Sequence, residues 1–422
     1  MNESATAAAE APAAPAPPKG FWEKIITTTP VVLTVIATLL AGQSSSEMTR
    51  AQYSRSLASQ NQSKVGDQWA YFQAKRTRTV ILDKTGDLMD ALTVTGQVDA
   101  GAIASLSKRL PEDLERAARD AERLAAAIAR AKDALGGDAA ALDASARRLL
   151  HSAQSAAAMA APASKKSAET LAALSKDGQL QATLEMLNSG DVPKVSEQHV
   201  SDPAIELAQS AISDRKPETE IAQLALAVST PTLRKAMDAA EANADAFDQA
   251  SKPLDKSMRA LNDLIAGQTS LIRELVLAVR DLKLTLSGLA IDEAKMPDEI
   301  RTPADRLDRL SSGLKASVDE LSTSMKAGWN RFNARRYERD ARYNQEAAFL
   351  YEIQVHQDSA RADHHLTRSH NFFYGMLAAQ MAVTIATLAL AVRQRSLLWG
   401  LASVAGLCAV LYGATVYLDM VP

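Results

Sequence analysis

Cysteine, glycine and aromatic residues are scarce in this sequence. Of its 422 residues only Cys408 is a cysteine, so no disulfide and no cysteine metal site is available within one chain. Aromatic residues make up 5% of the chain and 18 residues are glycine, which is too few of both for a compact sheet or barrel. Alanine, leucine, lysine, arginine and glutamate dominate instead, as is typical of long helices.

A strong charge of one sign is also lacking. The net charge of −3 provides no basic field, so we expect no nucleic acid partner. The chain contains no Walker loop, dinucleotide fingerprint, nucleophile elbow or zincin helix. We therefore expect a protein that is not an enzyme and that has no cofactor and no metal site.

Long apolar runs occur only near the two ends of the chain. The first, Ile25 to Ala41, contains no charge and is close to the lower limit of about 17 residues for crossing a bilayer. The next two, Phe372 to Val392 and Leu397 to Leu418, are separated by a segment that allows only a tight turn at one membrane face. We therefore predict three transmembrane helices, at residues 21–42, 372–392 and 397–418. The alternatives are a cleaved signal peptide at the N-terminus and a buried helical pair at the C-terminus.

The orientation of these spans depends on the basic residues that flank them. One side has Lys19, Lys24, Arg393 and Arg395, and the other has Arg50, Arg55, Arg361 and Arg368. The counts are equal, but two arginines in a short turn resist translocation more than charges spread along a long domain. We therefore expect the N-terminus in the cytoplasm and the large region between the first two spans outside it.

Helix breakers divide the region before the second span. Residues 1–20 are rich in alanine and proline and predict a disordered tail. Residues 43–84 lack proline and predict a membrane-proximal stalk helix that continues the first span. Residues 85–250 are Ala-rich and interrupted by glycine and proline, which predicts short helices, one starting at Pro111 and another after Ser164. Alanine offers little volume for a core, so close-packed small-residue interfaces and a loosely ordered bundle are both compatible with this region.

An apolar seam with a seven-residue period follows. Its positions alternate four and three residues apart, and all but one are apolar: Leu254, Met258, Leu261, Ile265, Gln268, Ile272, Leu275, Val279, Leu282, Leu286 and Leu289. This period predicts a left-handed coiled coil, and the alternative is one helix of an ordinary bundle. Gln268, the polar position, should be buried and need a partner, so we expect it to set register or oligomeric state.

A second seam begins after a proline-containing break at residues 296–303. It consists of Leu307, Leu310, Leu314, Val318, Leu321, Met325, Trp329 and Phe332. Its eleven-residue period predicts a straight or slightly right-handed coil. We predict that residues 251–371 form an antiparallel coiled-coil hairpin and a descending stalk helix about 100 Å long. Residues 254–289 and 44–84 together match that length, so we expect them to pair with its membrane-distal and membrane-proximal halves.

Histidine and arginine cluster before the second span. The histidines are His356, His364, His365 and His370. No pair has the i, i+4 spacing that clamps zinc, so we expect solvated or headgroup-contacting side chains. Five arginines lie among aromatic residues between positions 330 and 343, a mixture that also occurs in nucleic-acid binding sites. Acidic residues interrupt this run, so we expect ion pairs with neighbouring helices.

Polar side chains inside the three apolar runs are few, and none is an acid or a base. Gln380 is the most prominent, because an amide in lipid needs a hydrogen-bond partner on another span. We expect it to hold helices together rather than to serve in ion transport.

The stretch DQWAYFQAK, residues 67–75, follows the first span. The chain then ends with a histidine-containing stalk, a span around Gln380, an arginine turn and a final span with Trp399. This arrangement resembles the bacterial domain-of-unknown-function family 4337, whose members look like small three-span membrane proteins with a helical soluble part. The resemblance covers residues 25–80 and 340–420, and the chain departs from the short form by a long helical insertion. It implies a multi-pass topology in the bacterial inner membrane and no particular activity.

Large aromatic residues on a polar helix above the membrane predict a packing contact. We expect Trp69 and Phe72 to contact the descending helix around Arg335 to Phe349, or a second copy of the chain; a ligand-binding role is the alternative. The other interaction candidates are Gln268, Trp329, Phe332 and Gln380.

These observations predict an all-α membrane protein with three transmembrane helices, a long helical stalk with a coiled-coil hairpin, and an Ala-rich helical branch. The leading functional hypothesis is a non-enzymatic scaffold, tether or envelope-organising element. It would self-associate as a homo-oligomer and contact the lipid bilayer and an unidentified protein partner. The alternatives are a signal-transducing or channel-associated subunit whose stalk moves the spans, and an enzyme with an unrecognised site.

Overall fold

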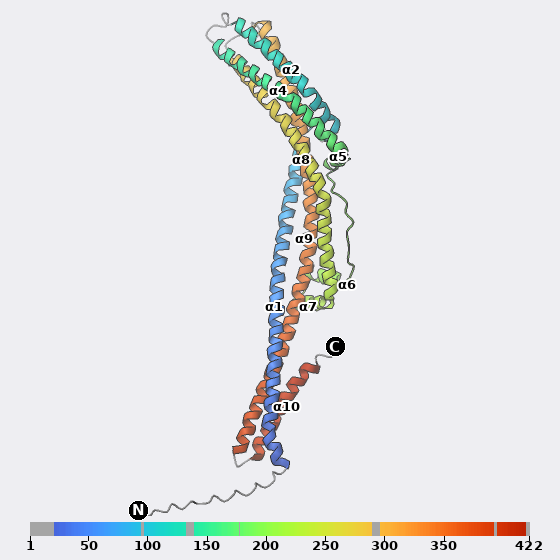
Figure 1. The fold of residues 1–422 in the computed structure, drawn as a ribbon, viewed down its shortest axis with the longest axis vertical. Coiled ribbons are helices and arrows are strands. Elements are labelled where there is room, and N and C mark those ends of the chain that lie inside the picture. Colours follow the sequence, from blue (N-terminus) through green and yellow to red (C-terminus); the bar gives the residue numbers. More distant parts are fainter. Residues whose placement is uncertain are drawn as a thin grey trace, which may run out of the picture. The chain divides into compact units, whose positions relative to one another are not determined.

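The structure, a computed structural model, describes residues 21–93, 97–131, 139–176, 178–288, 296–391 and 395–418. These residues contain helices and no strand, which confirms the predicted all-α class. The helices, shown in Figure 1, are α1 (Phe21–Asp90), α2 (Ala100–Arg130), α4 (Ala139–Lys176), α5 (Gln179–Ser189), α6 (Pro203–Ser213), α7 (Glu218–Ala227), α8 (Thr230–Gly288), α9 (Asp298–Ala391) and α10 (Arg395–Leu418). The predicted tail at residues 1–20 and part of the predicted turn between the last two spans lie outside the described residues.

The helices in the middle of the chain are longer than their prolines predict. α2 begins after Asp99, whose carboxylate accepts a hydrogen bond from the Ala102 amide at 3.2 Å and so caps the helix. Pro111 lies inside α2 and Pro162 lies inside α4, so the predictions of helix starts at Pro111 and after Ser164 are wrong. An internal proline costs about 3 kcal/mol. Burial of the leucine and alanine faces of both helices offsets that cost.

The chain forms two compact units, which we describe separately. Unit 1 comprises Met1–Lys64, Asp202–Ser229 and Tyr351–Pro422, and unit 2 comprises Val65–Ser201 and Thr230–Leu350. Unit 1 therefore contains the N-terminal part of α1, all of α6 and α7, the C-terminal part of α9, and α10.

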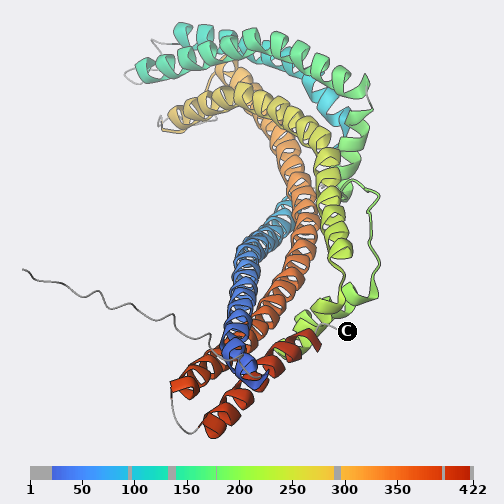
Figure 2. The same ribbon diagram turned by 60° about the horizontal axis from the view of Figure 1, so that its bottom comes forward.

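Three helices with parts in unit 1 are long and apolar enough to cross a membrane. They are α1, α9 and α10, as the apolar runs predict, and their apolar parts pack together (Figure 2). From Gly375 to the end of α9, its buried face consists of small residues, Gly375, Ala379, Ala382, Ala386 and Ala389. Leu40 of α1 lies 3.3 Å from the position that a Cβ would take at Gly375 of α9 or at Gly413 of α10. Small residues at such contacts allow membrane helices to approach closely.

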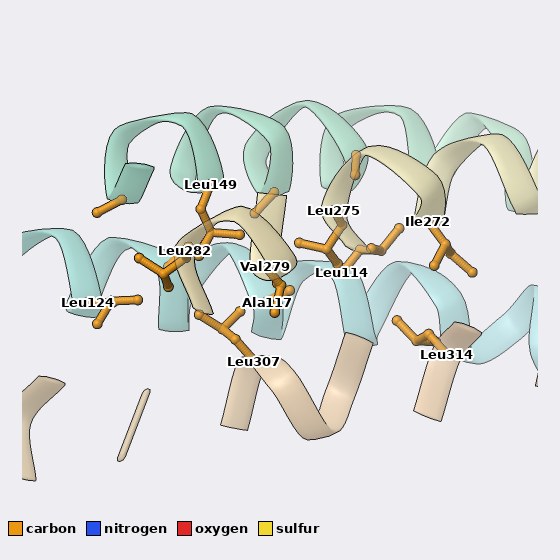
Figure 3. Close-up of a cluster of buried hydrophobic side chains, with 14 of the residues drawn as sticks. Leu114, Ala117, Leu124, Leu149, Ile272, Leu275, Val279, Leu282, Leu307 and Leu314 are labelled. Carbon is orange, nitrogen blue, oxygen red and sulfur yellow. The ribbon is translucent and has the colours of Figure 1, made fainter. Parts of the chain in front are cut away.

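α2, α4, α8 and the N-terminal part of α9 form a four-helix bundle in unit 2. Figure 3 shows its core, in which leucines from the four helices point toward one another: Leu124, Leu149, Leu282 and Leu307. Buried alanines of α2 and α4 complete this core: Ala117, Ala121, Ala146, Ala153 and Ala156. The Ala-rich region is therefore closely packed, which is the first of the two structures that its composition allows.

α8 and α9 run antiparallel in unit 2. The ammonium of Lys283 lies 2.9 Å from the Asp308 carboxylate, and the guanidinium of Arg336 lies 2.6 Å from the Asp255 carboxylate. Both pairs fit one register, so residues 255–283 of α8 face residues 308–336 of α9. The membrane-distal pairing predicted for these two segments is therefore present.

The predicted seam of α8 is buried on more than one side. It faces α2 and α4 as well as α9, and Leu264 and Leu271 beside it are also buried. A stripe this wide is typical of a bundle helix, whereas a two-stranded coiled coil buries a narrower seam. α8 is therefore one helix of an ordinary bundle, and not half of a two-stranded coiled coil. Leu289, the last residue of the predicted seam, lies outside the described residues.

α1 and α9 also pair antiparallel within each unit. In unit 1, residues 44–64 of α1 face residues 351–369 of α9. In unit 2, residues 69–90 face residues 331–349. α8 contacts α9 at Arg336, within the part of α9 that α1 already covers. α1 and α8 therefore contact the same part of α9 in unit 2. The helix lengths had predicted that the two would contact successive parts of α9, one after the other.

Candidate interaction site

Polar side chains join α1 and α9 in unit 1 directly after the apolar spans. The Ser369 hydroxyl donates to the Ser44 carbonyl at 2.8 Å, and the Ser44 hydroxyl donates to the Ser369 carbonyl at 3.0 Å. One turn further, a carboxylate oxygen of Glu47 lies 2.6 Å from Nδ1 of His365, and the Glu47 side chain is only 2% exposed. Arg50 contacts the same carboxylate at 3.0 Å. A buried carboxylate needs such partners, and together they specify how the two helices align.

His365 is an exception to the prediction for the histidine cluster. His364 and His370 are exposed, as expected for solvated side chains, whereas His356 is partly buried and His365 is partly buried against Glu47. The signal for this pair in the sequence is weak. Glu47 is the only acidic residue between the first span and Asp67, and nothing local indicates that it faces a histidine of another helix.

A second buried carboxylate lies further along the same helix pair. The side-chain amide of Asn61 donates to Asp358 at 3.2 Å, and Asp358 is 5% exposed. Burial raises the pKa of the Asp358 carboxyl, while Arg361 and the hydrogen bond from Asn61 act in the opposite direction.

Gln357 attaches α7 to α9 in unit 1. Its buried amide donates to the carbonyls of Ala225 and Val228 at the C-terminal end of α7. These carbonyls lie at the helix end, where few backbone donors remain, and that of Ala225 also accepts from the Val228 amide at 3.1 Å. A single glutamine therefore satisfies the end of one helix and fixes it to another.

An aromatic contact joins α1 and α9 in unit 2. The Trp69 ring lies edge-to-face on Phe349, at 5.3 Å between centroids, and on Phe72, at 5.5 Å. Phe349 belongs to the segment of α9 for which this contact is predicted. Tyr71, from the same stretch, is 58% exposed. The DQWAYFQAK stretch therefore directs the Trp69 ring towards α9 and Tyr71 towards the outside, while Phe72 contacts Trp69 on its own helix and no aromatic contact of its ring with α9 is present among the described residues.

All five arginines between residues 330 and 343 form ion pairs. Three bind other segments: Arg331 binds Asp90 of α1, Arg336 binds Asp255 of α8, and Arg339 binds Glu197 between α5 and α6. The other two pair with Glu338 on the same helix. The ion pairs expected with neighbouring helices are therefore present for Arg331 and Arg336, and the other three arginines pair with an irregular segment or within α9.

α5 ends against α9 in a close backbone contact. Gly190 follows α5 with φ of 73°, a conformation that favours glycine. A Cβ at Gly328 of α9 would lie only 2.7 Å from the carbonyl oxygen of Leu187. Next to this contact, the Asn188 side chain accepts from the Val98 amide at 2.8 Å and donates to the Val98 carbonyl at 3.0 Å. α5 is thus fixed both to α9 and to the residues before α2.

Side chains of α8 and α9 hold the extended segment that follows α5. Asn243 accepts from the Gln198 amide at 2.8 Å and donates to the Gln198 carbonyl at 2.9 Å. The Tyr343 hydroxyl donates to Glu197 at 3.0 Å, and burial together with this carboxylate raises the pKa of Tyr343 to about 12. The sequence contains no signal for these contacts, because each joins a helix to an irregular segment far away along the chain.

A family model described as a domain of unknown function (DUF4337) matches residues 22–162. This part of the chain is therefore similar to the DUF4337 family, and we call residues 22–162 the DUF4337 region. The match begins at the first span and contains the DQWAYFQAK stretch, which is the most specific part of the predicted resemblance. The match continues through α2 into α4. Residues 81–162, which we expected to belong to the insertion, therefore lie within the match. No curated protein and no solved structure matches the chain.

The DUF4337 region supplies the partner of Gln268. Gln268 is 3% exposed, and its amide donates to the Ser107 hydroxyl of α2, while its carbonyl oxygen is buried without a partner among the described residues. Its contact therefore aligns α8 with the DUF4337 region inside one chain. Phe332 is fully buried and Trp329 partly buried in the neighbouring core of unit 2.

Gln380 differs from the other candidates because it is exposed. Its side chain forms no hydrogen bond within the described part of the chain, and the buried face of this span is made of alanine. The described residues therefore do not supply the predicted partner on another span.

The described residues include a groove between two helices of unit 2. Among them, no group of three or more His, Cys, Asp or Glu side chains could hold a metal ion. An open groove of about 580 Å³ lies between α2, in the DUF4337 region, and α9; its charged lining residues are Arg109, Asp113, Arg116, Arg309 and Glu320. Neither histidine nor cysteine lines this groove.

Proposed function

We propose that this chain is a non-enzymatic, membrane-anchored helical protein that self-associates and acts as a scaffold, tether or envelope-organising element. One observation carries the proposal. α1 and α9 each continue without interruption from an apolar span into a polar helix, and their polar parts pair with each other. The bilayer holds the spans, and the charged outer faces of the bundle are available to a protein partner.

The chemistry of the α1 and α9 pair supports a mechanical role. Acidic side chains of one helix contact basic side chains of the other, as with Glu47 and His365 in unit 1 or Asp90 and Arg331 in unit 2. Such pairs specify the alignment of two helices more than they add to stability. A helix pair with a defined alignment suits a protein that positions other molecules at a bacterial inner membrane.

Membrane anchoring and self-association are tested on the full chain. After alkaline carbonate extraction the protein should stay in the membrane pellet, and release into the supernatant would contradict anchoring. In lipid nanodiscs its mass should correspond to two or more copies, and a monomeric mass would contradict self-association. Arg109→Gln with Glu320→Gln, in the groove, should leave both results and cellular function unchanged. Loss of function in that variant without a change in mass would favour a reaction site instead.

The orientation is tested with a single cysteine. Lys166→Cys in a Cys408→Ala background places the thiol on an exposed part of α4. We propose that the large helical region lies outside the cytoplasm, so a membrane-impermeant thiol reagent should label this variant in intact cells. Labelling only after permeabilisation would place the region in the cytoplasm.

A second candidate function is a signal-transducing or channel-associated subunit. The buried Glu47 and His365 pair directly beside the spans favours it, because apolar packing there would be at least as stabilising. Spin labels at Ser56 and Asp363 would report movement of α1 against α9 within unit 1. If the pair couples to the spans, His365→Gln should shift or broaden the distance distribution relative to the parent. An unchanged distribution would exclude this role for the pair.

A further inference from the structure

The polar residues of the second span lie on one exposed stripe of α9. Between Gly375 and the end of α9 the only polar side chains are Gln380, Thr384 and Thr387, and all three are exposed. They are four and three residues apart, and the same spacing adds three more exposed residues. We call the resulting set the α9 stripe: Phe373, Leu377, Gln380, Thr384, Thr387 and Ala391.

The buried face of the same span has the opposite character. Its residues Ala379, Ala382, Ala386 and Ala389 carry no polar side-chain atom and are fully buried within the chain. In membrane proteins, polar side chains are concentrated at helix contacts, and those facing lipid are apolar. The arrangement on α9 is reversed, so the α9 stripe is placed for a contact that the described residues of one copy do not supply.

Gln380 is the member of the α9 stripe that needs a partner outside its helix. The hydroxyls of Thr384 and Thr387 donate to the carbonyls of Gln380 and Thr384, at 2.9 and 2.8 Å. Exposed hydroxyls on the other spans, such as those of Thr34 and Ser403, also donate to carbonyls of their own helices. The glutamine amide has two donor hydrogens and an acceptor oxygen, and the described residues offer it no partner. An unpaired amide facing hydrocarbon is unfavourable by several kcal/mol.

We propose that the α9 stripe is the membrane interface between two copies of this chain, with the two Gln380 amides hydrogen-bonded to each other. The proposal rests on the self-association in the proposed function and locates it. An amide carries both donor and acceptor, so two identical copies satisfy each other, which lipid tails and an apolar span of another protein do not. The three-and-four spacing is that of a left-handed helix pair, the usual crossing in membrane bundles. Both copies have the same topology, so their α9 helices run parallel and bring the two glutamines to the same depth.

Disulfide cross-linking in membranes tests this interface. In a Cys408→Ala background, Thr384→Cys places a thiol on the α9 stripe, and Ser403→Cys places one on the exposed side of α10. Oxidation should give a covalent dimer of twice the chain mass with Thr384→Cys and not with Ser403→Cys. Adding Gln380→Leu to Thr384→Cys should weaken association by about threefold to thirtyfold, the usual range for an interhelical hydrogen bond in membranes. Gln380→Asn, which keeps the amide, should lose less.

The mass of the chain in nanodiscs separates the failure of this inference from the failure of the proposed function. If the chain is oligomeric but Thr384→Cys gives no dimer, the interface lies elsewhere and only the α9 stripe is excluded. If Gln380→Leu cross-links as well as its parent, the amide contact is wrong. A monomeric mass overturns both proposals. Circular dichroism of each variant should show unchanged helicity, because leucine suits a span at least as well as glutamine.

Discussion

Gly328→Ala adds a methyl group where α9 touches the backbone of α5 in unit 2. The added Cβ would lie 2.7 Å from the carbonyl oxygen of Leu187 and 3.3 Å from its Cβ. Because the nearest atom belongs to the backbone, no change of side-chain rotamer relieves the contact, and α5 must move away from α9.

The matched control for this variant is Gly313→Ala. Gly313 lies on the same helix, and a Cβ there would meet nothing within 4 Å. In both variants alanine gains about 1 kcal/mol of helix propensity over glycine. At Gly328 the overpacked contact costs about 1–3 kcal/mol. Gly313→Ala should therefore stabilise the protein by about 1 kcal/mol, and Gly328→Ala should be less stable than this control by about 1–3 kcal/mol.

Thermal unfolding of the full chain in detergent, followed by circular dichroism, compares the two variants. For a folding unit of this size, 1 kcal/mol shifts the midpoint by about 2–4 °C, so the two midpoints should differ by roughly 2–12 °C. Hydrogen exchange provides a local readout, since amides of α5 should exchange faster in Gly328→Ala only. Equal midpoints and equal exchange in the two variants would refute the close contact between α5 and α9.

Three further changes test the core and the segment after α5. Phe332→Ala should destabilise the protein by about 3–5 kcal/mol because the ring is fully buried, and Trp329→Ala should cost less; their thermal midpoints make this comparison. The pKa of Tyr343, raised to about 12, means that folding favours its neutral form, so its contribution to stability is complete below about pH 10 and is lost as the pH rises towards 12. Tyr343→Phe should therefore lose less stability than the parent over that range in alkaline melting curves, and identical curves would contradict the burial of the hydroxyl. Asn243→Ala leaves two backbone groups of Gln198 without their partner, so hydrogen exchange at the Gln198 amide should accelerate by at least about fivefold, whereas unchanged exchange would show that the segment is held by other contacts.

The helical class and the apolar spans could be predicted because they depend on local properties. Hydropathy over about 20 residues identifies a span, and composition with periodicity identifies a helix. Local rules were misleading at Pro111 and Pro162, where tertiary packing keeps a helix intact through a residue that normally ends one. Trp69 could be assigned to a helix contact because its size on a polar helix requires burial, and its ring does contact Phe349.

The partners of individual side chains required the tertiary structure. Each residue along a helix turns its side chain by about 100°, so a small difference in how two helices align decides whether Glu47 meets His365 or water. The same applies to Gln268, whose spacing is equally compatible with a coiled-coil seam and with the bundle in which it contacts Ser107.

The amino-acid sequence alone was enough to define an all-α chain with three apolar helices and a polar helical region, because burial of apolar residues and the absence of breakers act over short stretches. Only the packed structure decided that α8 belongs to a bundle, that His365 pairs with a buried carboxylate, and that Gln380 faces outward. These outcomes depend on contacts between residues far apart along the chain, and the rotation of each helix about its axis selects among contacts that the sequence pattern allows equally.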